Sequence, residues 1–292
     1  MSEPRTSAST STSDSTSDST AAADGGMETV TSADGTEIAF ERTGSGPPLV
    51  LVHGDASDHR FWDLSDVRAT LAADHTVYAM DCRGVGQSGD QEAYDLEREF
   101  EDVAAVVDAV DGSATLLGHS TGALLSLEAA RRTDDLRQLV LYEPPIPLDD
   151  RELVDDDALD EMERLLAEGA DEEVLVLFLQ EVAQSTPEEI DAQRAAPDWP
   201  DLVDTADLLE RKVRAVSEYE FDADRFASTT TPTVLLTGSE SPPFLRAGTE
   251  AVADALPNVR IVTFEDQAHE AMLTAPDRFI EEVRSVIGSA ER

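Results

Sequence analysis

A serine between two glycines, at the end of a short apolar run, is the residue best placed in this sequence to do chemistry. Residues 114–125 read ATLLGHSTGALL, so Ser120 lies between Gly118 and Gly122. Because glycine has no Cβ, two glycines at this spacing let the backbone turn sharply and pass close to its neighbours. An apolar strand before the turn and a helical pattern after it would leave the hydroxyl exposed. The spacing therefore predicts a nucleophilic serine on a strand–turn–helix.

A serine hydroxyl is a weak nucleophile at neutral pH and needs a base within hydrogen-bond reach, itself held by a carboxylate. His269 follows the last predicted strand, in a loop expected at the same edge of the sheet as Ser120. We therefore predict His269 as the general base. The other histidines occupy a strand end, early connections, or the position beside the serine, which is expected to point away from it: His53, His59, His75 and His119.

Short apolar strands that alternate with helical segments predict an α/β fold. Apolar positions at spacings of three and four predict helices over 95–110 and 121–132. This alternation favours a mostly parallel sheet covered on both faces, with a hairpin at its start. The predicted strands are 28–31, 37–43, 48–53, 76–80, 115–118, 138–142, 233–237 and 260–264.

The chain divides into three kinds of segment. Residues 1–26 are rich in Ser, Thr and Asp and have no periodic apolar residues, so this tail is expected to be disordered. Residues 27–143 and 227–292 form the predicted core. The strand–helix alternation stops over 144–226, where about three acidic amphipathic helices are expected. We interpret this insertion as a cap over the mouth of the sheet, with an ordinary packed helical subdomain as the alternative.

Several motifs together resemble the α/β-hydrolase superfamily, and the resemblance covers nearly all of the chain after Met27. His53-Gly54 is similar to the oxyanion loop of that family, residues 81–88 (DCRGVGQS) to its Asp-x-Arg-Gly-x-Gly-x-Ser turn, Ser120 to its nucleophile and His269 to its base. The resemblance implies an eight-stranded, mostly parallel sheet flanked by helices, with a helical cap inserted after strand six. It also implies acyl-transfer chemistry without a cofactor.

The resemblance assigns the oxyanion hole to two backbone N–H groups. One belongs to Thr121, the residue after the nucleophile, and the other to Asp55, the residue after His53-Gly54. Asp55 departs from the family, which often has an apolar residue at this position. Its carboxylate has to point away from the negative charge that develops in the transition state.

The acid of the triad also departs from the family pattern. In Gly-Ser-Glu-Ser-Pro, residues 238–242, Ser241 occupies the place where family members commonly carry aspartate. Glu143, after the sixth predicted strand, is a second place from which some members supply the acid, and it keeps the order Ser, acid, His. Glu240 is one residue from the usual place. We predict Glu143 as the acid, with Glu240 or neither residue as the alternatives.

The charge of the chain is extreme, with 63 acidic and 21 basic residues, a net charge of -42, and Lys212 as the one lysine. Self-repulsion of this size destabilises the compact state, and salt screens it, so we predict a protein of a salt-rich cytoplasm. The charge also opposes binding to nucleic acid phosphates, although mimicry of nucleic acid toward a basic partner is an alternative. The single cysteine, Cys82, rules out an intramolecular disulfide and a multi-cysteine zinc site.

The sequence shows neither an apolar stretch long enough to span a membrane nor a secretory signal, so we expect a cytoplasmic location and no membrane partner. We expect no metal and no cofactor, and the sequence does not define an oligomeric state. The predicted activity is a serine hydrolase that cleaves an ester or lactone of a small apolar substrate through an acyl-enzyme. Carbon–carbon or thioester hydrolysis, or a catalytically silent binding protein, are the alternatives. The residues expected to make the pocket apolar are Leu177, Phe178, Trp199, Pro145 and Ile146.

Overall fold

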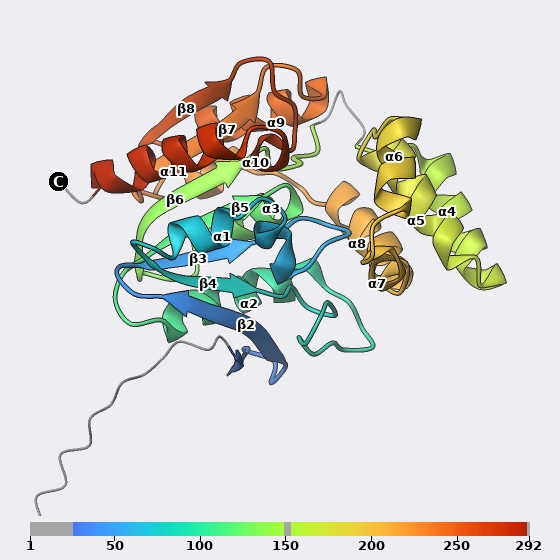
Figure 1. Ribbon diagram of the computed structural model, residues 1–292, viewed down its shortest axis with the longest axis horizontal. Helices are drawn as coiled ribbons and strands as arrows, with labels where there is room; N and C mark the ends of the chain where they lie inside the picture. The colour runs from blue at the N-terminus through green and yellow to red at the C-terminus, as the bar shows by residue number, and fades with distance from the viewer. Residues whose placement is uncertain (1–25, 149–152, 291–292) are drawn as a thin grey trace, which may run out of the picture.

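An eight-stranded sheet forms the centre of the protein in the computed structural model, which describes residues 26–148 and 153–290. The strand order is β1-β2-β4-β3-β5-β6-β7-β8, in which β1, β2 and β4 pair antiparallel and all other neighbours pair parallel. Each predicted strand is present, displaced by one or two residues at most, and the mostly parallel sheet is confirmed (Figure 1). The strands are β1 (Met27–Thr31), β2 (Glu37–Gly44), β3 (Pro48–Val52), β4 (Thr76–Met80), β5 (Ala114–His119), β6 (Leu136–Tyr142), β7 (Thr233–Gly238) and β8 (Val259–Phe264).

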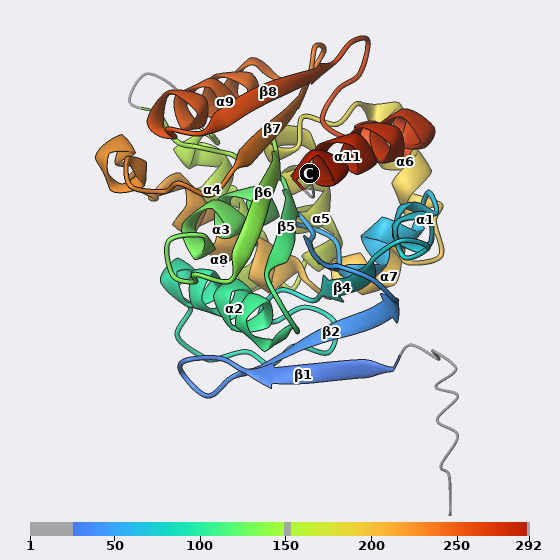
Figure 2. The same ribbon diagram turned by 90° about the vertical axis from the view of Figure 1, so that its left-hand side faces the viewer.

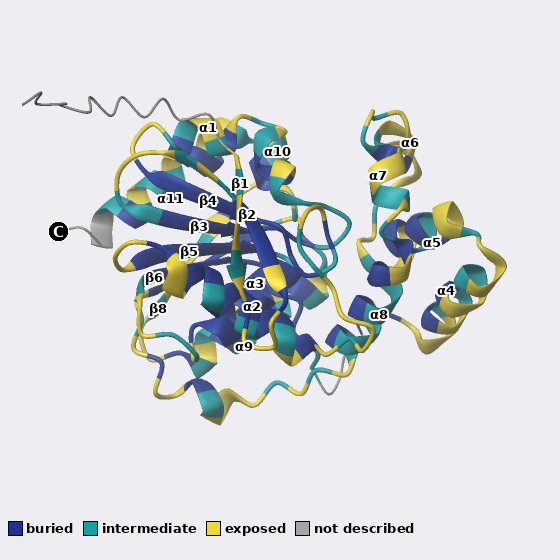
Figure 3. Ribbon diagram, turned by 90° about the horizontal axis from the view of Figure 1, so that it is seen from below, coloured by how far each residue is buried: buried dark blue, intermediate teal, exposed yellow. Residues whose placement is uncertain are grey.

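Helices cover both faces of the sheet, which explains why its central strands are continuous apolar runs rather than alternating ones. Successive residues of β5 show this, since Leu116 packs in one core cluster and Leu117 in the other. The buried central strands are dark blue in Figure 3, and Figure 2 shows helices on either side of them. The first face carries α2 (Leu96–Ala109), α3 (Thr121–Ala129) and α9 (Pro243–Ala255), and the second carries α1 (Val67–Leu71) and α11 (Pro276–Ala290).

The segment between β6 and β7 is helical and lies beyond one end of the sheet (Figure 1). It has its own cluster of buried apolar side chains. Its described residues form five α-helices rather than the expected three or so, because prolines begin helices here: α6 starts at Pro187, and Pro200 lies in the first turn of α7. The helices are α4 (Asp156–Glu168), α5 (Asp171–Leu177), α6 (Pro187–Arg194), α7 (Trp199–Val203) and α8 (Ala206–Ser217), with a π-helical turn, η2 (Phe178–Val182), after α5.

The structure bears in different ways on the predicted tail, on the absence of a membrane span and on Cys82. The tail interpretation concerns residues of which all but Gly26 lie outside the described part of the chain. Across 26–148 and 153–290, none of the helices combines the length and the apolar character that a membrane crossing requires. Cys82 is buried, and burial raises the pKa of its thiol, so it is a structural residue in this fold.

The surplus of acidic residues predicts a large effect of salt on stability. With a net charge of -42, most carboxylates have no basic residue to pair with, and their repulsion is screened as ionic strength rises. We expect the thermal midpoint to rise by about 10 °C or more between 0.1 M and 3 M KCl. Circular dichroism melts would measure it, with sucrose of equal osmolality as the uncharged control. A midpoint independent of KCl would contradict this explanation of the composition.

Candidate active site

Ser120 lies at the sharp turn between β5 and α3, as its spacing predicts. Its backbone angles, φ 55° and ψ -126°, are outside the regions that L-residues prefer, so the turn is strained. The flanking glycines are required by close packing. A Cβ on Gly118 would lie 2.3 Å from the carbonyl oxygen of Gly122, and one on Gly122 would lie 2.2 Å from that of His53. The two glycines therefore allow the strained turn that exposes the serine.

His269 and Glu143 come together although 126 residues separate them. His269 Nδ1 donates a hydrogen bond to Glu143 Oε2 at 2.7 Å, and Oε1 accepts from Thr237 Oγ1 at 2.6 Å and from the Gly238 N–H at 2.8 Å. Glu143 is fully buried directly after β6, in a left-handed conformation with φ 47°. Burial raises the pKa of this carboxyl, but the hydrogen bonds from His269 and Thr237 outweigh it and hold the pKa below the ordinary value. Glu143 is therefore a buried carboxylate aimed at the imidazole.

The other candidate acid lies elsewhere. Glu240 is exposed, and its carboxylate accepts a hydrogen bond from the neighbouring Ser239 and not from His269. Ser241 is buried close to Gly238, and its hydroxyl helps to lower the pKa of Glu143. The residue at the position that commonly carries the acid is therefore a buried serine in the surroundings of Glu143.

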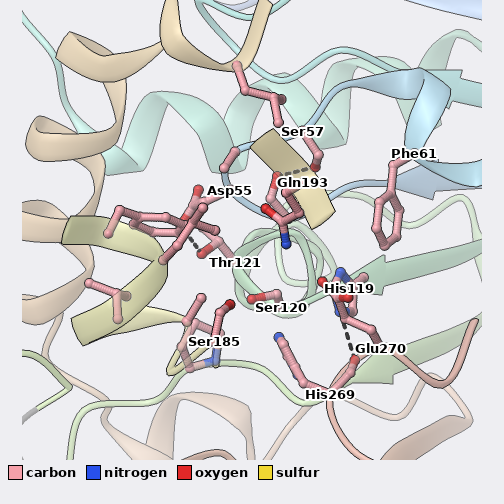
Figure 4. A pocket seen from close by; sticks show the side chains of 18 of the residues that line it. Asp55, Ser57, Phe61, His119, Ser120, Thr121, Ser185, Gln193, His269 and Glu270 are labelled. Carbon is pink, nitrogen blue, oxygen red and sulfur yellow. Dashed lines mark hydrogen bonds between the residues drawn. The ribbon is translucent and has the colours of Figure 1, made fainter. Parts of the chain in front are cut away.

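Ser120 and His269 line one cavity of about 280 Å³, and Figure 4 shows their side chains next to each other in it. Apolar side chains from the π-helical turn, Phe178, Leu179 and Val182, line its other side. Side chains of the helical insertion and of the core therefore line the same cavity. Of the residues expected to make the pocket apolar, Phe178 and Pro145 line the cavity. The other three were wrong, because Trp199 and Leu177 pack within the insertion and Ile146 packs in the core.

Thr121 and Asp55, the residues predicted to supply the oxyanion hole, both line the cavity that contains Ser120. Among the described residues, no group accepts a hydrogen bond from the N–H of Thr121 or of Asp55. Thr121 is the first residue of α3, where the helix leaves its N–H groups without internal partners and favours negative charge. The side chains of the same two residues bind each other, since Thr121 Oγ1 donates to Asp55 Oδ2 at 2.6 Å. The Asp55 carboxylate is thereby occupied by a side-chain donor.

His119 was expected to point away from Ser120, yet it lines the same cavity. Its ring stacks on Phe61, with centroids 5.1 Å apart, and lies 4.6 Å from the ring of His269. Its Nε2 is 3.1 Å from the carbonyl oxygen of His269. Because a carbonyl oxygen only accepts, Nε2 carries the proton, and burial lowers the pKa of His119 so that the ring is neutral. His119 therefore supports the loop that holds His269, a role the sequence analysis missed.

The turn over residues 81–88 has a structural role. Asp81 is buried and accepts hydrogen bonds from the backbone N–H and ring Nδ1 of His59 and from the N–H of Gln87. Asp58, His59 and Asp81 together bring possible metal ligands within 4.8 Å of one another. Their carboxylates already bind His59 and Arg60, however. This cluster fixes the loop that begins at His53-Gly54.

Comparison with known proteins agrees with this geometry. The profile of the Alpha/beta hydrolase family matches residues 49–282. The crystal structure of an alpha/beta hydrolase from Sphaerobacter thermophilus is 39% identical, with a TM-score of 0.74, and the match covers 87% of this chain and 99% of that one. That of an esterase from Rhodococcus sp. is 25% identical, with a TM-score of 0.66 over 90% and 99% of the two chains.

A curated relative matches over a shorter region. The non-heme haloperoxidase of Rhodococcus erythropolis is 36% identical over 98 residues, which are 33% of this chain and 35% of that protein. The chain thus aligns with about a third of this relative's length. The family profile covers most of the chain, and the sheet order and the turn at Ser120 fit it. The chain belongs to the alpha/beta hydrolase family.

Proposed function

We propose that this protein is a serine hydrolase that cleaves an ester or lactone of a small apolar substrate through an acyl-enzyme. The observation that carries the proposal is the 2.7 Å hydrogen bond between His269 Nδ1 and the buried Glu143 carboxylate, beside Ser120 in one cavity. In the neutral imidazole, this bond places the proton on Nδ1 and leaves Nε2 without one, which is the form that a general base needs.

Each group has a role in the proposed reaction. Ser120 Oγ attacks the carbonyl carbon while His269 takes the hydroxyl proton, and the N–H groups of Thr121 and Asp55 bind the oxyanion. His269 then gives that proton to the leaving alcohol as the carbon–oxygen bond breaks. In the second half, His269 removes a proton from water, which attacks the acyl carbon, and returns the proton to Ser120 Oγ as the bond between Oγ and the acyl carbon breaks and the acid leaves. Glu143 holds the imidazole and stabilises its protonated form.

The lining of the cavity supports a neutral, apolar substrate. Among the described residues, Arg60 is the one arginine or lysine that lines the cavity, and it already pairs with Asp58 and Asp201. Glu270, next to the base, also lines the cavity, and burial raises the pKa of its carboxyl. An anionic substrate would meet a carboxylate there without a free cation to bind it.

We also retain the cytoplasmic location and the salt-rich setting as proposals.

The alternatives predict different behaviour toward the same reagents. A silent binding protein of this fold would have no activated serine, so it would not react with a fluorophosphonate. Carbon–carbon and thioester hydrolases would react, because they can use the same nucleophile, and the substrate profile separates them. The intact hydrogen bond between Glu143 and His269 favours an activated serine.

The test is hydrolysis of p-nitrophenyl esters from acetate to dodecanoate in 2 M KCl, followed by stopped flow. We expect one equivalent of p-nitrophenol to appear in a burst before steady turnover, because acylation releases the phenol before water frees the enzyme. We expect kcat/KM to be highest for butyrate to octanoate and about tenfold lower for the half-ester of succinate, owing to its charge. Labelling by a fluorophosphonate should lower the amplitude of the burst in proportion to the fraction of enzyme that is labelled. A protein that neither labels nor turns over these esters would contradict the proposal.

A further inference from the structure

The one lysine of the chain is buried beside the candidate oxyanion hole. Lys212 lies on α8 of the helical insertion, with its side chain only 3% exposed. Leu208, Lys212 and Val216 follow one another at intervals of four residues, so they lie on the same face of α8. Leu208 and Val216 pack in the core cluster that also contains side chains of α2 and α3. The face of α8 that packs on the core therefore carries a cation where an apolar residue would be ordinary.

Lys212 meets two buried carboxylates. Its Nζ is 3.0 Å from Glu99 Oε2 and 3.6 Å from Asp55 Oδ1. Glu99 belongs to α2 and also accepts a hydrogen bond from the Tyr94 hydroxyl. Asp55 accepts from the Thr121 hydroxyl at 2.6 Å through its other oxygen. A continuous series of polar contacts therefore runs from α2, through the insertion, to Asp55 and Thr121, the two residues assigned to the oxyanion hole.

The buried carboxylates of Glu99 and Asp55 require a nearby positive charge, which Lys212 supplies. Two buried carboxylates repel each other, and a carboxylate left without a partner in a water-excluded place is unfavourable. The Asp55 carboxylate belongs to the same residue as one oxyanion donor, so an unbalanced charge there would oppose the negative charge that forms on the substrate oxygen. Lys212 is the one cation in contact with Asp55 among the described residues.

We propose that Lys212 is a positioning residue of the oxyanion hole. It holds the Asp55 carboxylate against the Thr121 hydroxyl, so that the two backbone donors stay at a fixed separation, and it cancels the charge of Asp55. The helical insertion thereby completes the catalytic site as well as covering it. This inference rests on the proposed function, since it concerns the oxyanion formed when Ser120 attacks.

A purely structural role would give a different result. If Lys212 only joined the insertion to the core, its loss would lower stability and substrate affinity by the same factor whatever residue stood at position 55. If it balances Asp55, the effect of its loss on kcat depends on the charge of residue 55. A double-mutant cycle separates the two explanations.

The experiment compares wild type, Lys212→Met, Asp55→Asn and the double variant with p-nitrophenyl butyrate in 2 M KCl. Rates are expressed per serine titrated by a fluorophosphonate, so unfolded molecules do not count. We expect Lys212→Met to lower kcat about 50-fold with KM changed less than about threefold. Asp55→Asn should lower kcat about fivefold, since the amide holds Thr121 less firmly, and adding Lys212→Met to it should cost no more than a further threefold.

Arg211→Met is the matched control. Arg211 is the neighbouring cation on α8; it pairs with Asp90 and lies over the Tyr94 ring, and among the described residues it makes no ion pair with Asp55 or Glu99. We expect its kcat to stay within about twofold of wild type. The inference is overturned if Lys212→Met keeps the wild-type kcat, or if it costs the same factor with Asp55 and with asparagine at that position. Failure of the proposed function is separate, because it would appear in the wild type as an absence of ester hydrolysis and of serine labelling.

Discussion

Replacement of Ser120 with alanine should abolish the burst of p-nitrophenol and lower kcat by about 10⁴-fold or more, the largest effect expected in this protein. Without Oγ there is no acyl-enzyme, and the remaining groups of the site can only assist direct attack by water. The strained turn does not depend on the hydroxyl, because no described residue receives a hydrogen bond from it and the close contacts are made by Gly118 and Gly122. We therefore expect the variant to fold and to bind substrate.

Ser185→Ala is the control for this prediction. Ser185 lines the same cavity from the helical insertion, so a fluorophosphonate can reach it as well. It has no histidine partner in the described structure, and its replacement should leave labelling and turnover within about threefold of wild type. Turnover that survives Ser120→Ala, or labelling that is lost with Ser185, would show that Ser120 is not the nucleophile.

The sheet and the serine turn could be predicted because both are written in local patterns. Apolar runs such as 48–52 are bounded by turn residues, and Ser120 lies between glycines that allow close backbone contact. His269 could be predicted because parallel strands place their following loops at one edge of the sheet. These inferences need only the neighbours of a residue along the chain and the direction of the strands.

The rest of the site depends on contacts between distant segments. The sequence left Glu143 and Glu240 open, because the hydrogen bond between Glu143 and His269 depends on the left-handed turn at Glu143 and on the donors Thr237 and Gly238. It did not predict which insertion residues reach the cavity, since Phe178 does so through a π-helical turn that periodicity does not reveal. One signal was available for Lys212: a single lysine on the apolar stripe of a helix is a buried charge that needs partners.

The hydrogen bonds around Glu143 determine how a glutamine at this position would be oriented. Oε1 accepts hydrogen bonds from Thr237 and Gly238, both of which are donors here, so a glutamine at this position has to place its carbonyl oxygen there. Its NH₂ group then faces His269 Nδ1, where the wild-type carboxylate accepts at 2.7 Å. This arrangement favours the imidazole tautomer that carries its proton on Nε2. That form cannot take the proton of Ser120.

Glu143→Gln should therefore lower kcat by about 10³-fold to 10⁴-fold with little change in KM, whereas Glu240→Gln, at the exposed candidate, should stay within about twofold of wild type. Against the effect of burial, hydrogen bonds from His269 and Thr237 hold the pKa of Glu143 below its ordinary value, so the wild-type carboxylate is ionised near neutral pH and its protonation does not limit activity there. The amide does not titrate, and a large loss should be present throughout pH 6 to 9. Measuring kcat for both variants across that range distinguishes the two candidate acids. A large loss in Glu240→Gln with a near-normal Glu143→Gln would place the acid after β7 and leave the carboxylate after β6 with a structural role.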